Sequence, residues 1–147
     1  MKKMMAAVTV VVTGASGCGG EQTPTAGSPS TAGPQRIEVT AVDYAFEDVP
    51  ETLEAGEITF VLTNEGEVRH EMYFGRMPPG VTIEEAALGP GDSGTEQLPL
   101  QILPTAPGAS DEVTLEFEPG RYGYACTLGA GKNRHSFRGM LGEFTVK

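Results

Sequence analysis

Histidine and cysteine are scarce in this chain: its 147 residues include two of each. Long apolar runs are also missing, because the longest, Met4–Ala15, is too short for a membrane-spanning helix. No internal repeat is present, and no Ser-His-Asp or phosphate-binding-loop signature is visible. The sequence therefore offers no pattern typical of a hydrolase or a nucleotide-binding enzyme.

Basic residues are few, with 10 against 20 acidic residues and a formal net charge of −10. An acidic balance of this size argues against nucleic-acid binding as the main task. The exception is residues 119–142, which carry Arg121, Lys132, Arg134 and Arg138 and no acidic residue. This basic region is compatible with electrostatic steering toward an acidic partner. The plainer alternative for the acidic residues is that most of them simply form a solvated surface.

The N-terminus has the pattern of a targeting segment. Two lysines precede the short apolar run, which ends in Ala15-Ser16-Gly17-Cys18. Small residues before a cysteine resemble a bacterial lipobox, although the leucine often found three residues before the cysteine is Ala15 here. We therefore expect residues 1–17 to be a lipoprotein signal peptide and Cys18 to be lipidated, which would anchor the protein to the outer face of a bacterial membrane. An ordinary secretory signal, giving a secreted protein, is the alternative.

The next segment, residues 18–35, consists mostly of Gly, Ser, Thr and Pro. With almost no apolar content it cannot bury enough surface to order itself, so we interpret it as a flexible linker. Residues 36–147 are then long enough for one hydrophobic core. We expect them to form a single, monomeric domain that meets the membrane only through the lipid anchor.

Short alternating segments predict an all-β domain. Apolar and polar residues alternate with the period of a half-buried strand, and Gly/Pro turns separate the segments, as in a β-sandwich or Greek-key barrel. The predicted strands are residues 37–42, 57–62, 69–74, 112–118, 121–127 and 140–146, with a turn at Asn64-Glu65-Gly66. One face of the third strand carries His70, Met72 and Phe74.

A long segment, residues 75–111, interrupts this pattern with several Pro and Gly turns. Within it, residues 81–88 favour a short helix with Thr82 as N-cap and Glu85 three residues later. A loop of this length is usually functional or mobile, and since it directly follows the His70 strand we expect it to cover one side of any site at His70.

Both histidines and Cys126 fall in two short segments: NEGEVRHEMYF with His70, and YACTLGAGKNRHSFRGMLGEFTV with Cys126, His135 and Met140. If Cys18 is lipidated, Cys126 is a lone extracytoplasmic thiol, which must be buried or bound; a Cys18–Cys126 disulfide is the alternative. Two imidazoles, one thiolate and one thioether are the ligands of a blue-copper site. Each residue alone is more often ordinary core, so the inference depends on their joint placement.

The domain resembles the cupredoxins, the family of plastocyanin and azurin, over residues 37–147. The resemblance lies in the Asn-Xaa-Gly turn before His70, in Tyr124-Xaa-Cys126 after a Pro-Gly turn, and in HSFRGMLG after the cysteine. It implies a Greek-key β-sandwich in which His70, Cys126 and His135 are strong copper ligands and Met140 is a weak axial ligand. One departure is that eight residues, TLGAGKNR, separate Cys126 from His135, where the family usually has only a few.

The leading hypothesis is a non-enzymatic, one-electron carrier with a single Cu(I)/Cu(II) ion. Its docking surface would include Lys132, Arg134 and Arg138 and would meet a redox protein with an acidic surface. An alternative is copper capture or delivery without obligate electron transfer, with Met77 as an exposed capture residue. A metal-free interaction module is a third hypothesis. A multicopper oxidase would need further histidines, and the chain has none to spare.

Overall fold

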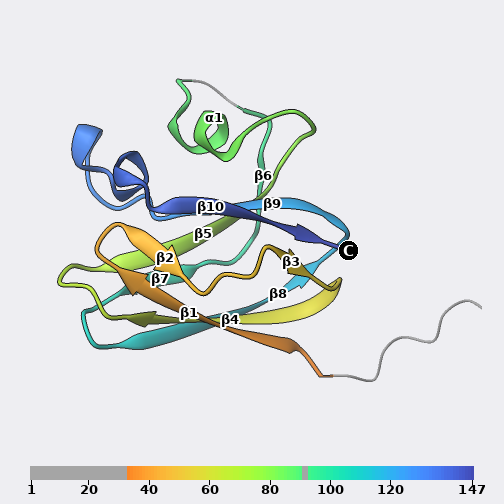
Figure 1. The fold of residues 1–147 in the computed structure, drawn as a ribbon, viewed down its shortest axis with the longest axis horizontal. Coiled ribbons are helices and arrows are strands. Elements are labelled where there is room, and N and C mark those ends of the chain that lie inside the picture. The colour runs from red at the N-terminus through yellow and green to blue at the C-terminus, as the bar shows by residue number, and fades with distance from the viewer. Residues whose placement is uncertain (1–32, 91–92) are drawn as a thin grey trace, which may run out of the picture. The chain divides into compact units, whose positions relative to one another are not determined.

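The computed structural model describes residues 33–90 and 93–147, all within one compact unit, Thr31–Lys147. The predicted signal peptide, Cys18 and most of the predicted linker lie outside the described residues. Two β-sheets face each other, with one short helix outside them (Figure 1). No helix within the described residues is long and apolar enough to cross a membrane.

The first sheet has the strand order β2-β1-β4-β8. Its strands are β1 (Gln35–Val42), β2 (Ala45–Glu47), β4 (Gly56–Asn64) and β8 (Ser110–Phe117). β1 runs parallel to β4, while β1–β2 and β4–β8 are antiparallel. The parallel register pairs Ala41 with Asn64, so the turn after β1 lies beside the loop that leads to His70.

The second sheet has the order β3-β10-β9-β5-β6, and β7 also pairs with β5. Its strands are β3 (Thr52–Leu53), β5 (His70–Arg76), β6 (Glu96–Gln97), β7 (Ile102–Thr105), β9 (Gly120–Ala125) and β10 (Leu141–Val146). β5 and β9 are antiparallel and pair Tyr73 with Ala125. The start of β5 and the end of β9 therefore lie at one end of the sandwich, where the 3₁₀-helices η1 (Gly131–Asn133) and η2 (His135–Arg138) follow.

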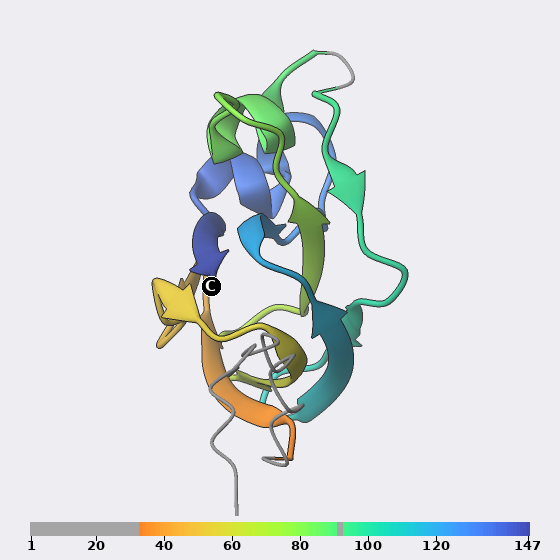
Figure 2. The ribbon, with the colours of Figure 1, turned by 90° about the vertical axis from the view of Figure 1, so that its right-hand side faces the viewer.

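Alternating residues of both sheets point inward and form one core, which lies between the two layers in Figures 1 and 2. At its centre Phe60 of the first sheet contacts Phe74 and Phe144 of the second, with ring centroids 4.7 and 5.6 Å apart. Burying each such ring contributes about 1.5–3 kcal/mol. This rigid core is the support for the loops at both ends of the sandwich.

The helix α1 (Ile83–Leu88) covers the outer face of the second sheet (Figure 1). It begins with the predicted capping box: Glu85 N–H donates to the Thr82 hydroxyl at 3.2 Å, and Thr82 N–H donates to the Glu85 carboxylate at 3.0 Å. Gly123 of β9 allows the helix to approach, since a Cβ there would lie 2.5 Å from Ile83 Cδ1.

The expected all-β sandwich and the short helix are confirmed, and all six predicted strands are present with shifts of one or two residues at their ends. The predicted turn at Asn64 is wrong by one residue, because Asn64 still belongs to β4. The segment 75–111 is also more structured than expected, since β6 and β7 both lie in it and β7 pairs with β5 beside His70.

Candidate metal centre

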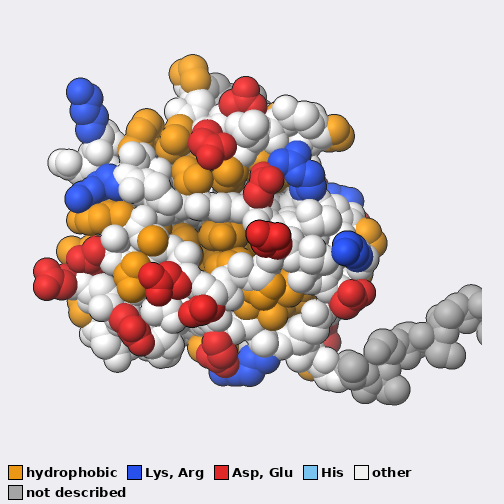
Figure 3. Space-filling model, viewed as in Figure 1, with side chains coloured by type: hydrophobic (Ala, Val, Ile, Leu, Met, Phe, Trp, Pro, Cys, Tyr) orange, Lys and Arg blue, Asp and Glu red, His pale blue; other side chains and the backbone are white. Residues whose placement is uncertain are grey.

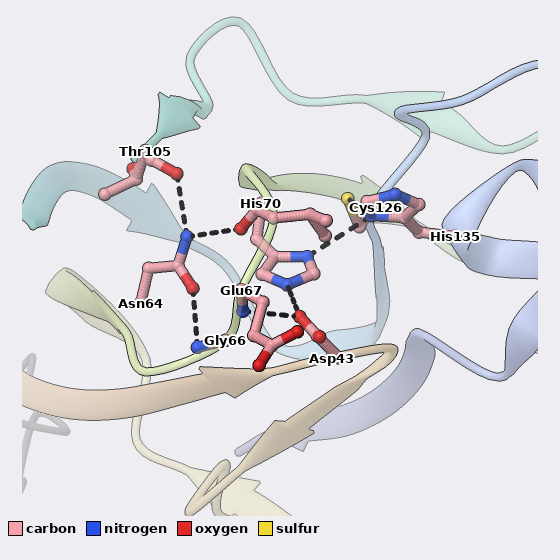
Figure 4. A network of polar contacts seen from close by, with 9 residues as sticks. Asp43, Asn64, Gly66, Glu67, His70, Thr105, Cys126 and His135 are labelled. Atoms are coloured by element: carbon pink, nitrogen blue, oxygen red, sulfur yellow. Dashed lines mark hydrogen bonds and ion pairs between the residues drawn. The ribbon is translucent and has the colours of Figure 1, made fainter. Parts of the chain in front are cut away.

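His70 is the first residue of β5 and is fully buried. Its two ring nitrogens face different partners. Nδ1 lies 3.2 Å from Nδ1 of His135, while Nε2 lies 3.3 Å from Oδ1 of Asp43 (Figure 4). The ring therefore points one nitrogen into the interior of the site and the other toward the β1–β2 turn.

Cys126 directly follows β9, and its free thiol has no exposed surface. Its Sγ lies 3.3 Å from Nδ1 of His135, the first residue of η2, which is 9% exposed. In the part of the chain that the structure describes, His70, Cys126 and His135 are the one group of His, Cys, Asp or Glu side chains positioned to hold a metal ion, with donor atoms within 4.8 Å of one another.

This arrangement fits a metal ion of the size that proteins bind with nitrogen and sulfur. Donors about 2.0–2.3 Å from one ion lie about 3.2–3.8 Å apart when the geometry is near tetrahedral. The separation of the two Nδ1 atoms, 3.2 Å, and that of Cys126 Sγ from His135 Nδ1, 3.3 Å, both fall within that range. Imidazole nitrogen and thiolate sulfur are also the donors that soft and borderline transition metals prefer.

Met140 is fully buried, and its backbone is hydrogen-bonded to the backbones of Cys126 and His135. Cys126 N–H donates to the Met140 carbonyl at 3.0 Å, and Met140 N–H donates to the His135 carbonyl at 3.1 Å. The structure thus places all four predicted ligand residues at one end of the sandwich, with Met140 tied to two of them through its main chain.

The eight residues between Cys126 and His135 form a loop that closes on itself. His135 N–H donates to the Leu128 carbonyl at 2.8 Å, so the chain returns at His135 to the point that it left at Leu128. Between them, η1 is exposed, while Leu128 packs against the core. The additional length therefore projects outward and leaves His135 beside Cys126.

Asn64 holds the loop that leads to His70. Its side-chain amide donates to the carbonyls of Val68 and Thr105 at 2.8 and 2.9 Å, and its carbonyl accepts from Gly66 N–H at 2.9 Å (Figure 4). Because Asn64 is fully buried, each of these bonds would be costly to lose. This network fixes the position at which β5, and with it His70, begins.

Burial also sets the protonation of the free site. It raises the pKa of the Cys126 thiol, mainly because a thiolate would be poorly solvated there. Burial, followed by the neighbouring His70 ring, lowers the pKa of His135. Before a metal binds, Cys126 is therefore a thiol and the His135 imidazole is neutral at pH 7.

No protein-family model and no curated protein matches the sequence. Similar solved structures exist, however. An auracyanin from the photosynthetic bacterium Roseiflexus castenholzii matches with a TM-score of 0.57 at 23% identity, covering 79% of this chain and 99% of that chain. Auracyanin A, a blue copper protein from Chloroflexus aurantiacus, matches with a TM-score of 0.52 at 24% identity, covering 78% and 100%.

This chain has the cupredoxin fold. A blue copper oxidase from Nitrosomonas europaea is also similar, with a TM-score of 0.53 at 18% identity. That match covers 78% of this chain but 39% of the oxidase, so the chain corresponds to a minor part of that protein. The fold inferred from the sequence is thus confirmed. The four predicted ligand residues lie together at one end of this cupredoxin sandwich.

Tyr44 lies beside the candidate ligand His135. It follows Asp43 in the β1–β2 turn of this cupredoxin fold with φ of 70°, and this conformation directs its ring toward the histidines. The ring contacts His135 edge-on, with centroids 5.1 Å apart, and the Arg138 guanidinium carbon lies over the Tyr44 ring, 3.3 Å from its centroid.

The predicted docking residues differ in exposure. Lys132 and Arg138 are exposed, on η1 and η2 respectively, while Arg134 is half-buried with its Nε atom shielded from solvent. Phe137 of η2 is half-exposed beside them. The end of the cupredoxin sandwich that carries His135 thus presents both cationic and apolar side chains.

The sequence analysis missed Glu71, a buried carboxylate next to His70. Its Oε1 accepts from the Thr127 hydroxyl at 2.7 Å and from Thr127 N–H at 3.2 Å. Glu71, which follows His70, is thereby hydrogen-bonded to Thr127, which follows Cys126. The adjacent positions of Glu71 and Thr127 in two neighbouring strands were the available signal, but the strand register was needed to use it.

Proposed function

We propose that this protein is a blue copper electron carrier in which His70, Cys126 and His135 bind one copper ion, with Met140 as a weak axial ligand. The observation that carries the proposal is the convergence of three buried donors, two Nδ1 atoms and one Sγ, at one end of a cupredoxin fold. When bound, copper supplies a one-electron couple between Cu(I) and Cu(II).

The surrounding residues support copper rather than a hydrolytic metal. Imidazole serves both copper oxidation states, while thiolate and thioether favour Cu(I). The donors are buried: His70 begins β5, Cys126 directly follows β9, and His135 begins η2, where its N–H is bonded to the Leu128 carbonyl. The protein therefore holds them in one arrangement and excludes water. A buried site leaves little room for a substrate, which supports a carrier rather than an enzyme.

The surface near His135 supports a redox partner with an acidic docking face. Figure 3 shows Lys and Arg side chains over the part of the molecule that carries η1 and η2 in Figure 1, with Asp and Glu side chains below them, over β1 and β2. The exposed charges of Lys132 and Arg138 would accelerate encounter with an acidic partner. The association rate is then expected to fall at high salt.

The same proposal places the protein on the outer face of a bacterial membrane, tethered through Cys18. Its support is the lipobox-like sequence before Cys18 and the polar, Gly/Pro-rich segment after it. A flexible linker of this composition would allow the copper domain to reach partners at a distance from its anchor.

Copper capture or delivery has weaker support. Its specific candidate was Met77 as an exposed capture residue, and that expectation is wrong: Met77 is buried beneath α1, where its sulfur lies near Gly123. With Met77 enclosed, no exposed methionine of the described residues was found to favour that function over electron transfer.

The test is a visible absorption spectrum of the protein after addition of Cu(II), with Cys126→Ser as the matched variant. A thiolate-to-copper band that is intense in the original protein and absent in the variant would support the proposal. A reversible redox couple with slow loss of Cu(I) to a chelator would then favour a carrier over delivery. Copper binding without that band would contradict Cys126 ligation, and no binding would contradict the whole proposal.

A further inference from the structure

The β1–β2 turn places a carboxylate directly behind His70. Asp43 Oδ1 lies 3.3 Å from Nε2, on the side of the ring opposite to the one that faces His135. A neutral imidazole has one N–H and one lone pair, and a carboxylate accepts but does not donate hydrogen bonds. The contact therefore assigns the proton of His70 to Nε2 and leaves the Nδ1 lone pair toward the cluster of donors.

Other contacts fix this carboxylate in place. The same Oδ1 accepts from Glu67 N–H at 2.9 Å (Figure 4). An aspartate carboxyl is ordinarily ionised at neutral pH, so Asp43 brings a negative charge to this contact. The Asp43 side chain is about one-third exposed, whereas His70 has no exposed surface, so the ring cannot replace this partner with bulk water without rearrangement.

Gly66 shows how closely the two side chains are packed. A Cβ at Gly66 would overlap Asp43 Oδ1 and would lie 2.9 Å from His70 Nε2. The space beside the contact is thus available only because position 66 has no side chain. An incidental surface ion pair would not need this clearance, which favours a specific role for Asp43.

We propose that Asp43 is a positioning residue for the metal centre: it holds His70 in the Nε2–H form and its negative charge favours the oxidised, more positive ion. The second half rests on the proposed copper function. Carboxylates that accept from the far nitrogen of a metal-bound histidine fix the ring orientation and raise its basicity. A fixed negative charge also stabilises Cu(II) more than Cu(I), because the ion carries one more positive charge.

Three variants separate the hydrogen bond from the charge. Asp43→Asn keeps an oxygen that can accept from Nε2 and from Glu67 N–H but removes the charge. Asp43→Ala removes both. Asp48→Asn is the matched control, because Asp48 lies in the same hairpin region, has φ of 66°, which asparagine tolerates, and removes an equal charge. Circular dichroism spectra establish that each variant is folded.

The first measurement needs no metal. Nitrogen-15 NMR of the metal-free protein at about pH 8, well above the ordinary histidine pKa, reports which ring nitrogen carries the proton. We expect His70 as Nε2–H in the original protein, in Asp43→Asn and in Asp48→Asn, and a mixture of both forms in Asp43→Ala. If Asp43→Ala keeps the Nε2–H form alone, the positioning role is wrong.

The second measurement compares Cu(II) and Cu(I) affinities. We expect Asp43→Ala to weaken Cu(II) binding by about 10–100-fold, as loss of such carboxylates does elsewhere. Asp43→Asn should shift the ratio of the two affinities toward Cu(I) by about tenfold, which is 59 mV for a one-electron couple. A shift no larger than that of Asp48→Asn would overturn the role of the charge. If the original protein binds no copper, the proposed function fails, while the NMR result still decides whether Asp43 positions His70.

Discussion

Gly129 is the residue on which closure of the loop between Cys126 and His135 depends. Its φ of 92° lies in the region that favours glycine, and a Cβ there would overlap the Asn133 carbonyl oxygen and lie 3.0 Å from Cα of Arg134. These neighbours are backbone atoms, which cannot move aside as a flexible side chain would. Gly129→Ala should therefore open the loop that brings His135 to its position.

A matched variant lies two residues away. Gly131 also has a positive φ, of 53°, but no atom lies within 4 Å of the place its Cβ would occupy. Gly131→Ala should cost about 1 kcal/mol, for the left-handed conformation alone. Gly129→Ala carries that cost together with about 1–3 kcal/mol for overpacking. We expect the difference between the two variants to be about 1–3 kcal/mol.

Two assays measure this difference. Urea unfolding of the metal-free protein gives the change in the free energy of unfolding, and a Cu(II) titration gives the change in affinity. If the loop opens locally, the cost of the substitution will appear mainly as weaker Cu(II) binding rather than as a lower free energy of unfolding. Each 1.4 kcal/mol of that cost corresponds to about a tenfold loss of affinity. Equal results for Gly129→Ala and Gly131→Ala in both assays would refute the argument that loop closure positions His135.

Three further predictions concern the same site. Because burial raises the pKa of the Cys126 thiol and lowers that of the His135 imidazole, binding of Cu(II) should displace about one proton, from Cys126. The affinity for Cu(II) should therefore rise about tenfold per pH unit near neutrality. Calorimetry in buffers of different ionisation enthalpy measures the number of protons released. Glu71→Ala leaves Thr127 N–H without its partner and should lower the free energy of unfolding by about 1–3 kcal/mol. Glu71→Gln should lower it by less, because the glutamine side-chain oxygen can still accept from Thr127 N–H. Equal losses for the two variants would contradict this prediction. Replacing residues 129–134 by Asn-Gly should preserve the copper absorption band and weaken the salt dependence of partner association, and loss of the band would show that the longer loop is needed.

Most of the fold follows from local patterns. Strands β1 and β8 alternate between more and less buried residues, β1 over its whole length and β8 from Glu112 to Phe117, and the capping box at Thr82 and Glu85 marks the start of α1. The missed strands were short: β2, β3 and β6 have two or three residues, too few to show a period. β7 has four residues, contains Pro104, and is buried only at its two ends, so its pairing with β5 comes from tertiary contacts.

The site shows a similar division. His70, Cys126 and His135 were found because their residue types are rare in this chain and occur in two motifs. Asp43 was missed because its partner is 27 residues away, and only the parallel pairing of β1 with β4 brings its turn beside the His70 loop. The contacts of Asp43 and Tyr44 depend on where the β1–β2 turn lies in space, which alternation along either strand does not report.

The loop between Leu128 and His135 has two tasks: it positions His135 beside Cys126, and it presents charged residues at the surface. A short ligand loop would have to do both with the same residues, whereas this loop divides them. The hydrogen bond from His135 N–H to the Leu128 carbonyl is the one that a β-turn would make with only two residues between them. The additional residues are therefore not needed to bring His135 to Cys126. They instead form η1 and present Lys132 at the surface. Changes in that outer segment can alter the charge that a partner meets while the ligand positions, held by the loop closure and the backbone bonds of Met140, stay the same.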